Sequence, residues 1–302
     1  MAPRGWWQRR LINVATLEGV SIVIATRDRP AVLRETLESI GEGDRLPAEL
    51  IVADQSARAT ALPSLGAEVS VRHLRLPAKG VSRARNAGIA VATEQILVFT
   101  DDDVLVERDW LRLLVEALQR APSRTAVTGR VLAAEADGHV PSVTYREEPE
   151  VFAGRLFADV LFQNNMAIRR EAFDEVGLFD ERLGPGSAFP SAEDNDFGYR
   201  LLEAGYTIEF VPEAVVHHRG ARRGRELAAL QWAYGCGQGA FYAKHMSPSD
   251  LHMLRRFGRN AAFRLRRMAR VGRGERSALR EGIYLVGLFW GALSWLARAR
   301  RG

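Results

Sequence analysis

The alternation of short apolar segments with helix-forming segments constrains the fold of this chain more than any other feature. Residues 20–26 (VSIVIAT) are apolar and β-branched and too few for a buried helix, so they predict a buried strand. Leu33, Leu37 and Ile40 then recur at helical spacing behind Asp28, the predicted N-cap. Strands that alternate with helices need crossover connections, which place parallel strands under helices on both faces. We therefore predict an α/β fold with a mostly parallel sheet flanked by helices.

The same alternation continues beyond the first helix. We predict further strands at residues 49–53, 69–74, 95–100, 166–168 and 206–211, the last of them ended by Pro212. We predict helices at residues 82–92, 170–176 and 194–204. Loops marked by Asp137, Gly138, Pro141 and Pro149 interrupt the pattern, and the region beyond Gly220 is predicted to be helical.

Charge divides the chain into two parts. Of its 42 basic and 37 acidic residues, 18 basic and 4 acidic residues lie in 219–302, so the preceding body is net acidic. This pattern predicts a body that carries the chemistry and a tail that meets an anionic surface, either lipid or nucleic acid. The single cysteine, Cys236, excludes an intramolecular disulfide. With no signal-peptide core in the first ten residues, we expect a cytoplasmic protein.

Polar residues follow the predicted strands, where ligands bind in parallel sheets. Asp101, Asp102 and Asp103 come directly after the strand at 95–100, and their repulsion calls for a cation. Carboxylate ligands suit Mg²⁺ or Mn²⁺, and such ions are commonly completed by substrate phosphates. The triplet therefore predicts a metal site for a diphosphate-bearing ligand. The alternative is a solvated acidic turn.

Two other segments point to ligand binding in the first half of the chain. Arg83 and Arg85 lie at the start of a predicted helix, where guanidinium and free N–H groups favour phosphate, although a basic surface turn is the alternative. Asp54 ends the second predicted strand, where it can accept hydrogen bonds from a base or ribose, or only shape a turn.

The second half adds a carboxylate pair and a histidine pair. Asp194, beside Glu193 at the mouth of a predicted helix, is a candidate general base, with helix capping as the alternative. His217 and His218 follow a predicted strand, so one imidazole can complete a metal shell, unless the pair is structural.

In their order along the chain these segments resemble the family 2 glycosyltransferases, whose fold is GT-A. The resemblance runs from residue 20 to residue 218 and includes the opening strand, the second strand, the donor-binding helix and the Asp-x-Asp motif at 98–103. Residues 163–170, 176–181, 193–194 and 212–218 are similar to the acceptor side. Two features depart from the family: residues 53–56 read Ala-Asp-Gln-Ser, where it more often has Asp-Asp-Gly-Ser, and the histidine is doubled.

The resemblance implies an inverting single displacement. An acceptor hydroxyl, on a polysaccharide, glycolipid or lipid-linked glycan, attacks a nucleotide-diphospho-sugar while Mn²⁺ or Mg²⁺ stabilises the departing diphosphate. The implied roles are Asp194 as base, Thr26, Arg27 and Asp54 at the nucleoside, Arg83 at the donor, Asp101 and Asp102 at the ribose and nucleotide, and Asp103 at the metal with His217 or His218.

The predicted organisation is an N-terminal extension (1–19), a GT-A catalytic domain (20–220, with a nucleotide-sugar half at 20–131 and an acceptor half at 132–220) and a basic helical region (221–302). Residues 283–297 form an apolar run of 15 residues, short of the about 20 that span a membrane. With Trp290, Trp295 and flanking arginines, they predict an interfacial helix on the anionic inner face of the cell membrane. The alternative is a core helix packed on the catalytic domain or on a second subunit.

Two other functions compete with sugar transfer. A nucleotidyltransferase acting on sugar phosphates would need a glycine-rich phosphate loop after the first strand, and residues 26–30 contain no glycine. A nucleic-acid-binding or membrane-binding module would use the arginine-rich tail but leave the aspartates and Asp194 unexplained. We therefore expect no specific nucleic-acid partner.

Overall fold

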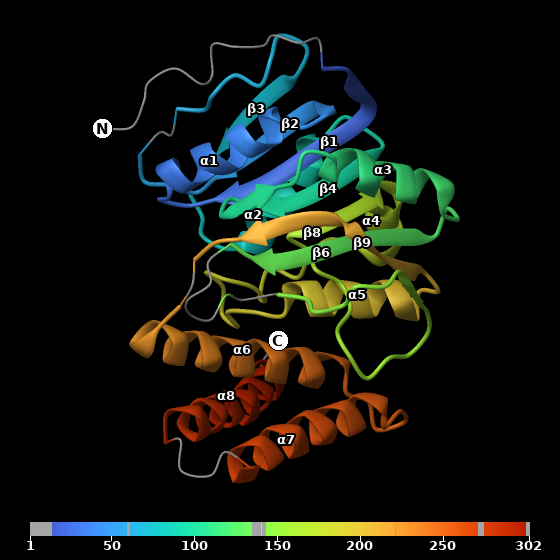
Figure 1. The fold of residues 1–302 in the computed structure, drawn as a ribbon. Helices are drawn as coiled ribbons and strands as arrows, with labels where there is room; N and C mark the ends of the chain where they lie inside the picture. The colour runs from blue at the N-terminus through green and yellow to red at the C-terminus, as the bar shows by residue number, and fades with distance from the viewer. Residues whose placement is uncertain are drawn as a thin grey trace.

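The computed structural model describes residues 14–58, 61–134, 140, 143–220, 222–270 and 275–299. The described chain contains a nine-stranded sheet in the order β3-β2-β1-β4-β8-β6-β9-β5, with β7 paired to β9 (Figure 1). The strands are β1 (Thr16–Thr26), β2 (Leu46–Asp54), β3 (Ser70–Arg75), β4 (Ile96–Asp101), β5 (Val104–Val106), β6 (Thr125–Ala133), β7 (Glu150–Phe152), β8 (Asn165–Arg169) and β9 (Thr207–His218). The helices are α1 (Pro30–Gly41), α2 (Val81–Val91), α3 (Trp110–Arg120), α4 (Glu171–Val176), α5 (Glu193–Glu203), α6 (Gly224–His245), α7 (His252–Arg270) and α8 (Glu275–Ala299).

The predicted α/β class with a mostly parallel central sheet is confirmed. Strands β3, β2, β1 and β4 are all parallel, β6 and β9 are parallel, and β8 lies antiparallel between β4 and β6. The strand at 20–26 begins earlier than predicted, because β1 already pairs with β2 at Thr16. Four residues of the predicted N-terminal extension are thus part of the sheet, and residues 1–13 of that extension lie outside the described residues, as do Asp137, Gly138 and Pro141.

Helices cover both faces of the sheet, because alternate residues of each strand point to opposite sides. On one face, Ile22 and Ile24 of β1 pack in a cluster with Leu37 of α1 and Leu114 of α3. On the other face, Val23 belongs to a second cluster, which includes residues of α2, α4 and α5. The strands are therefore buried on both sides, which explains their nearly continuous apolar sequences.

The predicted end of a strand at Pro212 is wrong, since β9 continues to His218. Proline lacks the N–H group that a sheet ladder needs. Here the pairing of β9 with β6 skips: Val211 lies opposite Gly129, and Val215 lies opposite the next residue, Arg130. This irregularity absorbs the proline and carries the strand on to the histidine pair.

The prediction that Asp28 caps the first helix is also wrong. Helix α1 starts at Pro30 without a side-chain cap. Asp28 has a left-handed backbone (φ 56°), and its carboxylate accepts a hydrogen bond from the backbone N–H of Ala57 at 2.9 Å. Asp28 therefore joins the loops that follow β1 and β2.

The three C-terminal helices form a separate layer that lies beyond α5, coloured orange to red in Figure 1. Helices α6 and α8 touch backbone to backbone: a Cβ atom on Gly239 would lie 1.9 Å from the carbonyl oxygen of Leu288, and one on Gly291 would lie 1.9 Å from that of Cys236. Only glycine allows this approach. The apolar run at 283–297 is therefore half buried, as the core-helix alternative expected, and Trp295 packs against Phe189 of the sheet-bearing part.

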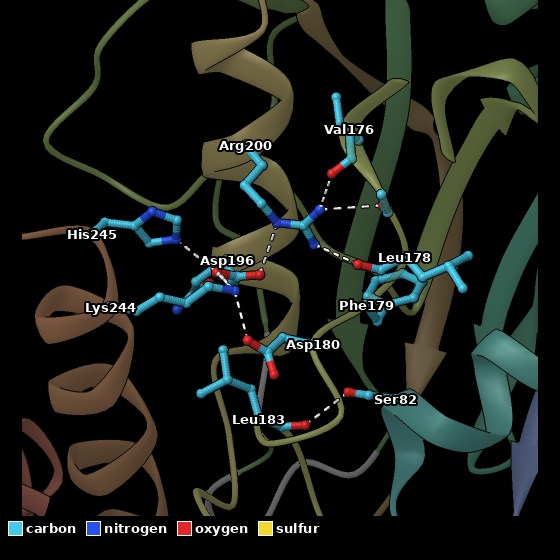
Figure 2. Close-up of polar contacts among 12 residues, drawn as sticks. Ser82, Val176, Leu178, Phe179, Asp180, Leu183, Asp196, Arg200, Lys244 and His245 are labelled. Carbon is cyan, nitrogen blue, oxygen red and sulfur yellow. Dashed lines mark hydrogen bonds and ion pairs between the residues drawn. The ribbon is translucent and has the colours of Figure 1, made fainter. Parts of the chain in front are cut away.

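A buried ionic cluster fastens this layer to α5 (Figure 2). The fully buried carboxylate of Asp196 accepts hydrogen bonds from Arg200 Nε at 3.0 Å and His245 Nε2 at 2.7 Å, and it forms an ion pair with Lys244 Nζ at 2.7 Å. Burial raises the pKa of Asp196, but the hydrogen bond from His245 and the nearby positive charges outweigh it, so the pKa is lowered. Lys244 also binds Asp180 at 2.7 Å, which fixes the end of α6 to two segments of the preceding fold.

Within the part of the chain that the structure describes, no helix is both long and apolar enough to cross a membrane. The predicted boundaries between the N-terminal extension, the two halves of the catalytic domain and the basic helical region, at residues 19/20, 131/132 and 220/221, stay predictions.

Candidate active site

A cavity of about 900 Å³ lies where β1 and β4 end, between the sheet and the C-terminal helices. Its lining includes Thr26 and Asp101 at the strand ends and Asp194 at the start of α5. The opposite wall includes Tyr234 of α6 and Arg264 of α7. The cavity therefore occupies the position at which parallel sheets bind ligands, and helices from beyond residue 220 form part of it.

Three residues of the cavity could hold a metal ion. Asp101, Asp103 and His218 each offer one ligand atom, and these atoms lie within 4.8 Å of one another. The antiparallel pairing of β5 with β9, in which Val104 lies opposite His218, brings the aspartate turn to the end of β9. His218 Nδ1 donates to the carbonyl oxygen of Arg219 at 2.5 Å, which leaves Nε2 facing the aspartates. Two carboxylates and an imidazole oriented in this way fit Mn²⁺ or Mg²⁺.

The two neighbouring histidines have different surroundings, because successive residues of a strand point to opposite faces. His218 Nε2 lies 3.6 Å from Asp103 Oδ1. His217 Nε2 lies 2.7 Å from Glu107 Oε1, and His217 is absent from the cavity lining of the described chain. The structure therefore brings His218, and not His217, to the aspartates.

Two arginines neutralise the aspartate turn. The side chain of Arg85 is 4% exposed and bridges Asp101 at 2.9 Å and Glu193 at 3.0 Å. Arg29, which sequence reasoning did not assign, pairs with Asp103 at 2.6 Å and also contacts Asp102. The available signal for Arg29 was its position in the short loop between the first strand and the first helix. The guanidinium groups of Arg29 and Arg85 thus supply part of the positive charge that the three aspartates need.

Asp102 is part of the cavity lining, although it is buried against β1 and α1. It is fully buried, its carboxylate accepts a hydrogen bond from Thr26 Oγ1 at 2.6 Å, and its backbone carbonyl accepts one from Thr36 Oγ1 at 2.8 Å. Burial raises the pKa of Asp102 to about 7, although the charge of Arg29 opposes this effect. The predicted contacts of Asp102 and Thr26 with the nucleotide stay predictions, and their observed contact fixes the turn against β1.

The other predicted donor residues divide between the cavity and its surroundings. Arg27 lines the cavity, and so does Gln55 beside Asp54. Asp54 itself is fully buried and outside the described lining. Burial raises the pKa of Asp54, but hydrogen bonds from Ser56 and His73 and the charge of Arg75 outweigh it, so the pKa falls to about 2. Its role at the nucleoside stays a prediction.

Helix α2 presents one of its two arginines to the cavity. Arg83 pairs with Glu181 at 2.9 Å on the surface and is not part of the described lining, whereas Arg85 is. Residues two apart on a helix point in different directions, so only one of them can face the site. The predicted donor contact of Arg83 stays a prediction.

The candidate base lies in the first turn of α5. Asp194 lines the cavity two residues after Ala192, whose left-handed backbone (φ 70°) turns the chain into the helix. Burial, with repulsion from Glu193 and Asp159, raises the pKa of Asp194 to about 8. A carboxylate with a pKa near neutrality is suited to taking a proton from a hydroxyl group.

This arrangement matches known proteins in sequence and in fold. The pre-mycofactocin glycosyltransferase of Mycobacterium tuberculosis is 29% identical over 237 residues, which cover 75% of this chain, and the match spans 48% of that relative, about half its length. The succinoglycan biosynthesis protein ExoM of Rhizobium meliloti is 32% identical over 224 residues, which cover 70% of both chains.

Solved structures share the fold at low sequence identity. The mannosyltransferase PcManGT from Pyrobaculum calidifontis, solved in complex with GDP-Man and Mn²⁺, superimposes with a TM-score of 0.60 at 16% identity over 91% of this chain and 87% of its own. Residues 1–349 of TarS from S. aureus give a TM-score of 0.56 at 14% identity, over 95% of this chain and 92% of that structure.

The family model described as glycosyl transferase family 2 matches residues 21–177, more than half of the chain. The matched segment contains the aspartate turn and Arg85, and Asp194 and His218 follow it. The chain belongs to glycosyl transferase family 2.

Proposed function

We propose that this chain is an inverting glycosyltransferase that moves a sugar from a nucleotide-diphospho-sugar to an acceptor hydroxyl with the help of Mn²⁺ or Mg²⁺. The observation that carries the proposal is the bridge made by Arg85. It joins Asp101 of the candidate metal cluster to Glu193, the neighbour of the candidate base Asp194, inside one cavity. Metal ligands and base therefore lie on adjoining parts of one wall.

The proposed chemistry is a single displacement. The acceptor oxygen bonds to the anomeric carbon, and the bond from that carbon to the diphosphate breaks, with its electron pair leaving on the phosphate oxygen. Asp194 takes the hydroxyl proton, and its raised pKa makes it a stronger base than an ordinary carboxylate. Asp101, Asp103 and His218 would hold the ion, which supplies positive charge at the departing diphosphate.

We assign the donor to the side of the cavity formed by β1 and β4. Arg27 and Gln55 lie there to meet the nucleoside, with Thr26 and Asp54 holding the loops beneath them. The PcManGT structure, which holds GDP-Man and Mn²⁺, supports a nucleotide-sugar with a divalent ion as the ligand pair.

Donor-induced stabilisation tests this proposal. We expect one class among UDP-, GDP- and dTDP-sugars to raise the melting temperature of the full chain in the presence of Mn²⁺, because a ligand that binds only the folded state stabilises it. The shift should disappear in Asp103→Asn and persist in Asp109→Asn, which makes the same change at a half-exposed surface position. Folded protein that responds to none of these donors would contradict the proposal.

We also propose that α7 and α8 attach the enzyme to the anionic inner face of the cell membrane. One side of α8 exposes Val286, Trp290 and Leu293, each at least 58% accessible. Exposed arginines on α7 include Arg255 and Arg266. Apolar side chains beside basic ones are typical of helices that lie in an anionic interface. The predicted tail residues Arg270, Arg300 and Arg301 have side chains outside the described part of the chain.

Vesicle binding tests the attachment. The protein should sediment with phosphatidylglycerol vesicles and not with phosphatidylcholine vesicles. Leu293→Glu should weaken this binding, whereas Val151→Glu, on an exposed residue of β7, should not. Binding to duplex DNA at the same salt concentration, with none to the anionic vesicles, would overturn the attachment in favour of a nucleic-acid surface.

A further inference from the structure

The cavity wall next to β8 contains buried amide groups that the fold does not use. Gln163 and Asn164 are 3% and 4% exposed and line the cavity. Within the described residues, Gln163 Nε2 and both amide atoms of Asn164 have no hydrogen-bond partner. Buried polar atoms nearly always have one in a folded protein. Their position in the cavity wall indicates that a ligand supplies it.

The wall opposite is built by the C-terminal helices and is also rich in amides. Asn260 Nδ2 donates to Tyr284 Oη at 3.2 Å, and Asn260 Oδ1 has no partner in the ranges that the structure covers. Gln238 is held in place, since its Oε1 accepts from Asn195 at 2.7 Å and its Nε2 donates to Asp159 at 3.0 Å. Asn260 of α7 and Tyr284 of α8 both line the cavity, and α8 packs against α6, which His245 joins to α5.

Amide and tyrosine groups select the chemistry of the ligand. Each amide offers a donor and an acceptor in one plane, so a group that can both donate and accept, such as a hydroxyl, satisfies it best. The carboxylates of Asp159, Glu193 and Asp194 line the same region and can accept hydrogen bonds from hydroxyl groups. A ligand with several neighbouring hydroxyl groups on a ring, a saccharide, fits both walls.

We propose that Gln163, Asn164 and Asn260 form a subsite for a saccharide unit of the acceptor, so that the attacking group is a sugar hydroxyl. This inference rests on the proposed function and adds the residues that recognise the acceptor. The hydroxyl loses its proton to Asp194, which lines the same cavity, as its oxygen bonds to the anomeric carbon and the nucleoside diphosphate departs. Asn195 couples the wall to this base, because it follows Asp194 and binds Gln238.

The test separates acceptor binding from donor binding. With Mn²⁺ and the donor that stabilises the protein, transfer is measured to p-nitrophenyl and octyl glycosides of glucose, galactose, mannose and N-acetylglucosamine. Hydrolysis of the donor in the absence of glycoside gives the donor KM. The two aglycones distinguish a soluble sugar from one carried on a lipid, because an alkyl chain adds affinity only in the second case.

Asn164→Leu removes the amide and keeps its approximate volume. We expect the KM for the glycoside to rise at least tenfold and the donor KM to change less than twofold. Because the amide atoms have no partner among the described residues, the melting temperature without ligands should not fall. Gln119→Leu, on an exposed residue of α3, is the matched control and should change none of these values.

Four results would overturn the inference. If the donor is hydrolysed but no glycoside accepts the sugar, the acceptor is not a saccharide, and the proposed function stands. A donor KM that rises as much as the glycoside KM would place the amides at the donor. A fall in melting temperature that accounts for the lost activity would show that the Asn164 amide serves the fold. If no donor binds or is hydrolysed, the proposed function fails, and the subsite fails with it.

Discussion

The neighbouring histidines allow a sharp test of the metal site, because one sequence pair contains both the variant and its control. His218→Ala removes a ligand atom from the cluster of Asp101 and Asp103. His217→Ala removes the same side chain one residue earlier, where it pairs with Glu107. We expect only the first change to weaken Mn²⁺ binding.

The expected size follows from the number of ligands. The protein offers three, and loss of even an outer contact to a metal ligand typically reduces affinity about 10- to 100-fold. At an ion concentration of about 100 times Kd, binding stabilises the wild type by about 2.7 kcal/mol, whereas a 100-fold weaker site at that concentration gives about 0.4 kcal/mol. With about 2 °C per kcal/mol for a chain of this size, the Mn²⁺-dependent rise in Tm should fall from about 5 °C to about 1 °C.

Differential scanning fluorimetry measures this shift at fixed UDP or GDP, with and without Mn²⁺. Each variant is compared with its own metal-free sample, so any direct effect of the substitution on folding cancels. A full shift in His218→Ala, or equal losses in both variants, would refute the assignment of His218 as the third ligand.

The remaining predictions concern the base, the helical layer and the apo protein. Burial and neighbouring carboxylates raise the pKa of Asp194 to about 8, so kcat/KM should increase with pH and level off above about pH 8. An increase in kcat/KM that is already complete near pH 4 would exclude Asp194 as the base. The raised pKa of Asp194 favours folding below about pH 4, and this contribution is lost as the pH rises towards 8. Asp194→Asn should therefore be more stable than the wild type at pH 8, which urea unfolding can measure. The same variant should transfer sugar about 10²-fold or more slowly. Gly239→Ala should lower the free energy of unfolding by about 1–3 kcal/mol, because the added Cβ meets the backbone of α8. Gly258→Ala, which has open space around it, should raise the free energy of unfolding by about 0.5–1 kcal/mol. Equal effects of the two variants in thermal unfolding would contradict this packing. EDTA should abolish transfer without lowering the Tm of donor-free protein, because Arg85 already pairs with Asp101 and Arg29 with Asp103. A large fall in Tm would show that the fold depends on the ion.

The sequence predicted the sheet well where a strand is buried on both faces. Runs such as 20–26 and 95–100 carry their own signal, and the structure contains strands at both. The end of β9 could not be predicted, because a proline normally ends a strand and its tolerance here depends on the skipped pairing with β6. That extension decides where the histidine pair lies.

Site residues were identified by type more easily than by direction. The sequence placed Arg83 and Arg85 together at a helix start, but which one faces the cavity depends on how α2 is rotated against the sheet. The choice between His217 and His218 depends likewise on which face of β9 meets the aspartate turn. Both answers come from packing between segments that are distant in the sequence.

The C-terminal helices were the hardest part to predict. Hydropathy marks 283–297 as an apolar run and leaves its partner open. The glycines that bring α6 and α8 into backbone contact, Gly235, Gly239, Gly287 and Gly291, contribute little to hydropathy. Their spacing of four residues on both helices was the available signal.

The composition of the cavity wall has a consequence for engineering. The family model covers residues 21–177, whereas the proposed acceptor side also draws on Asp194 and on helices from residue 224 onward. The proposed acceptor subsite is thus divided: Gln163 and Asn164 lie in the stretch that the family model covers, and Asn260 of α7 lies beyond it. Chimeras that exchange α6–α8 between relatives should change the acceptor and leave the donor as it was. The exchanged helices must keep Lys244 and His245, because these residues pair with Asp196.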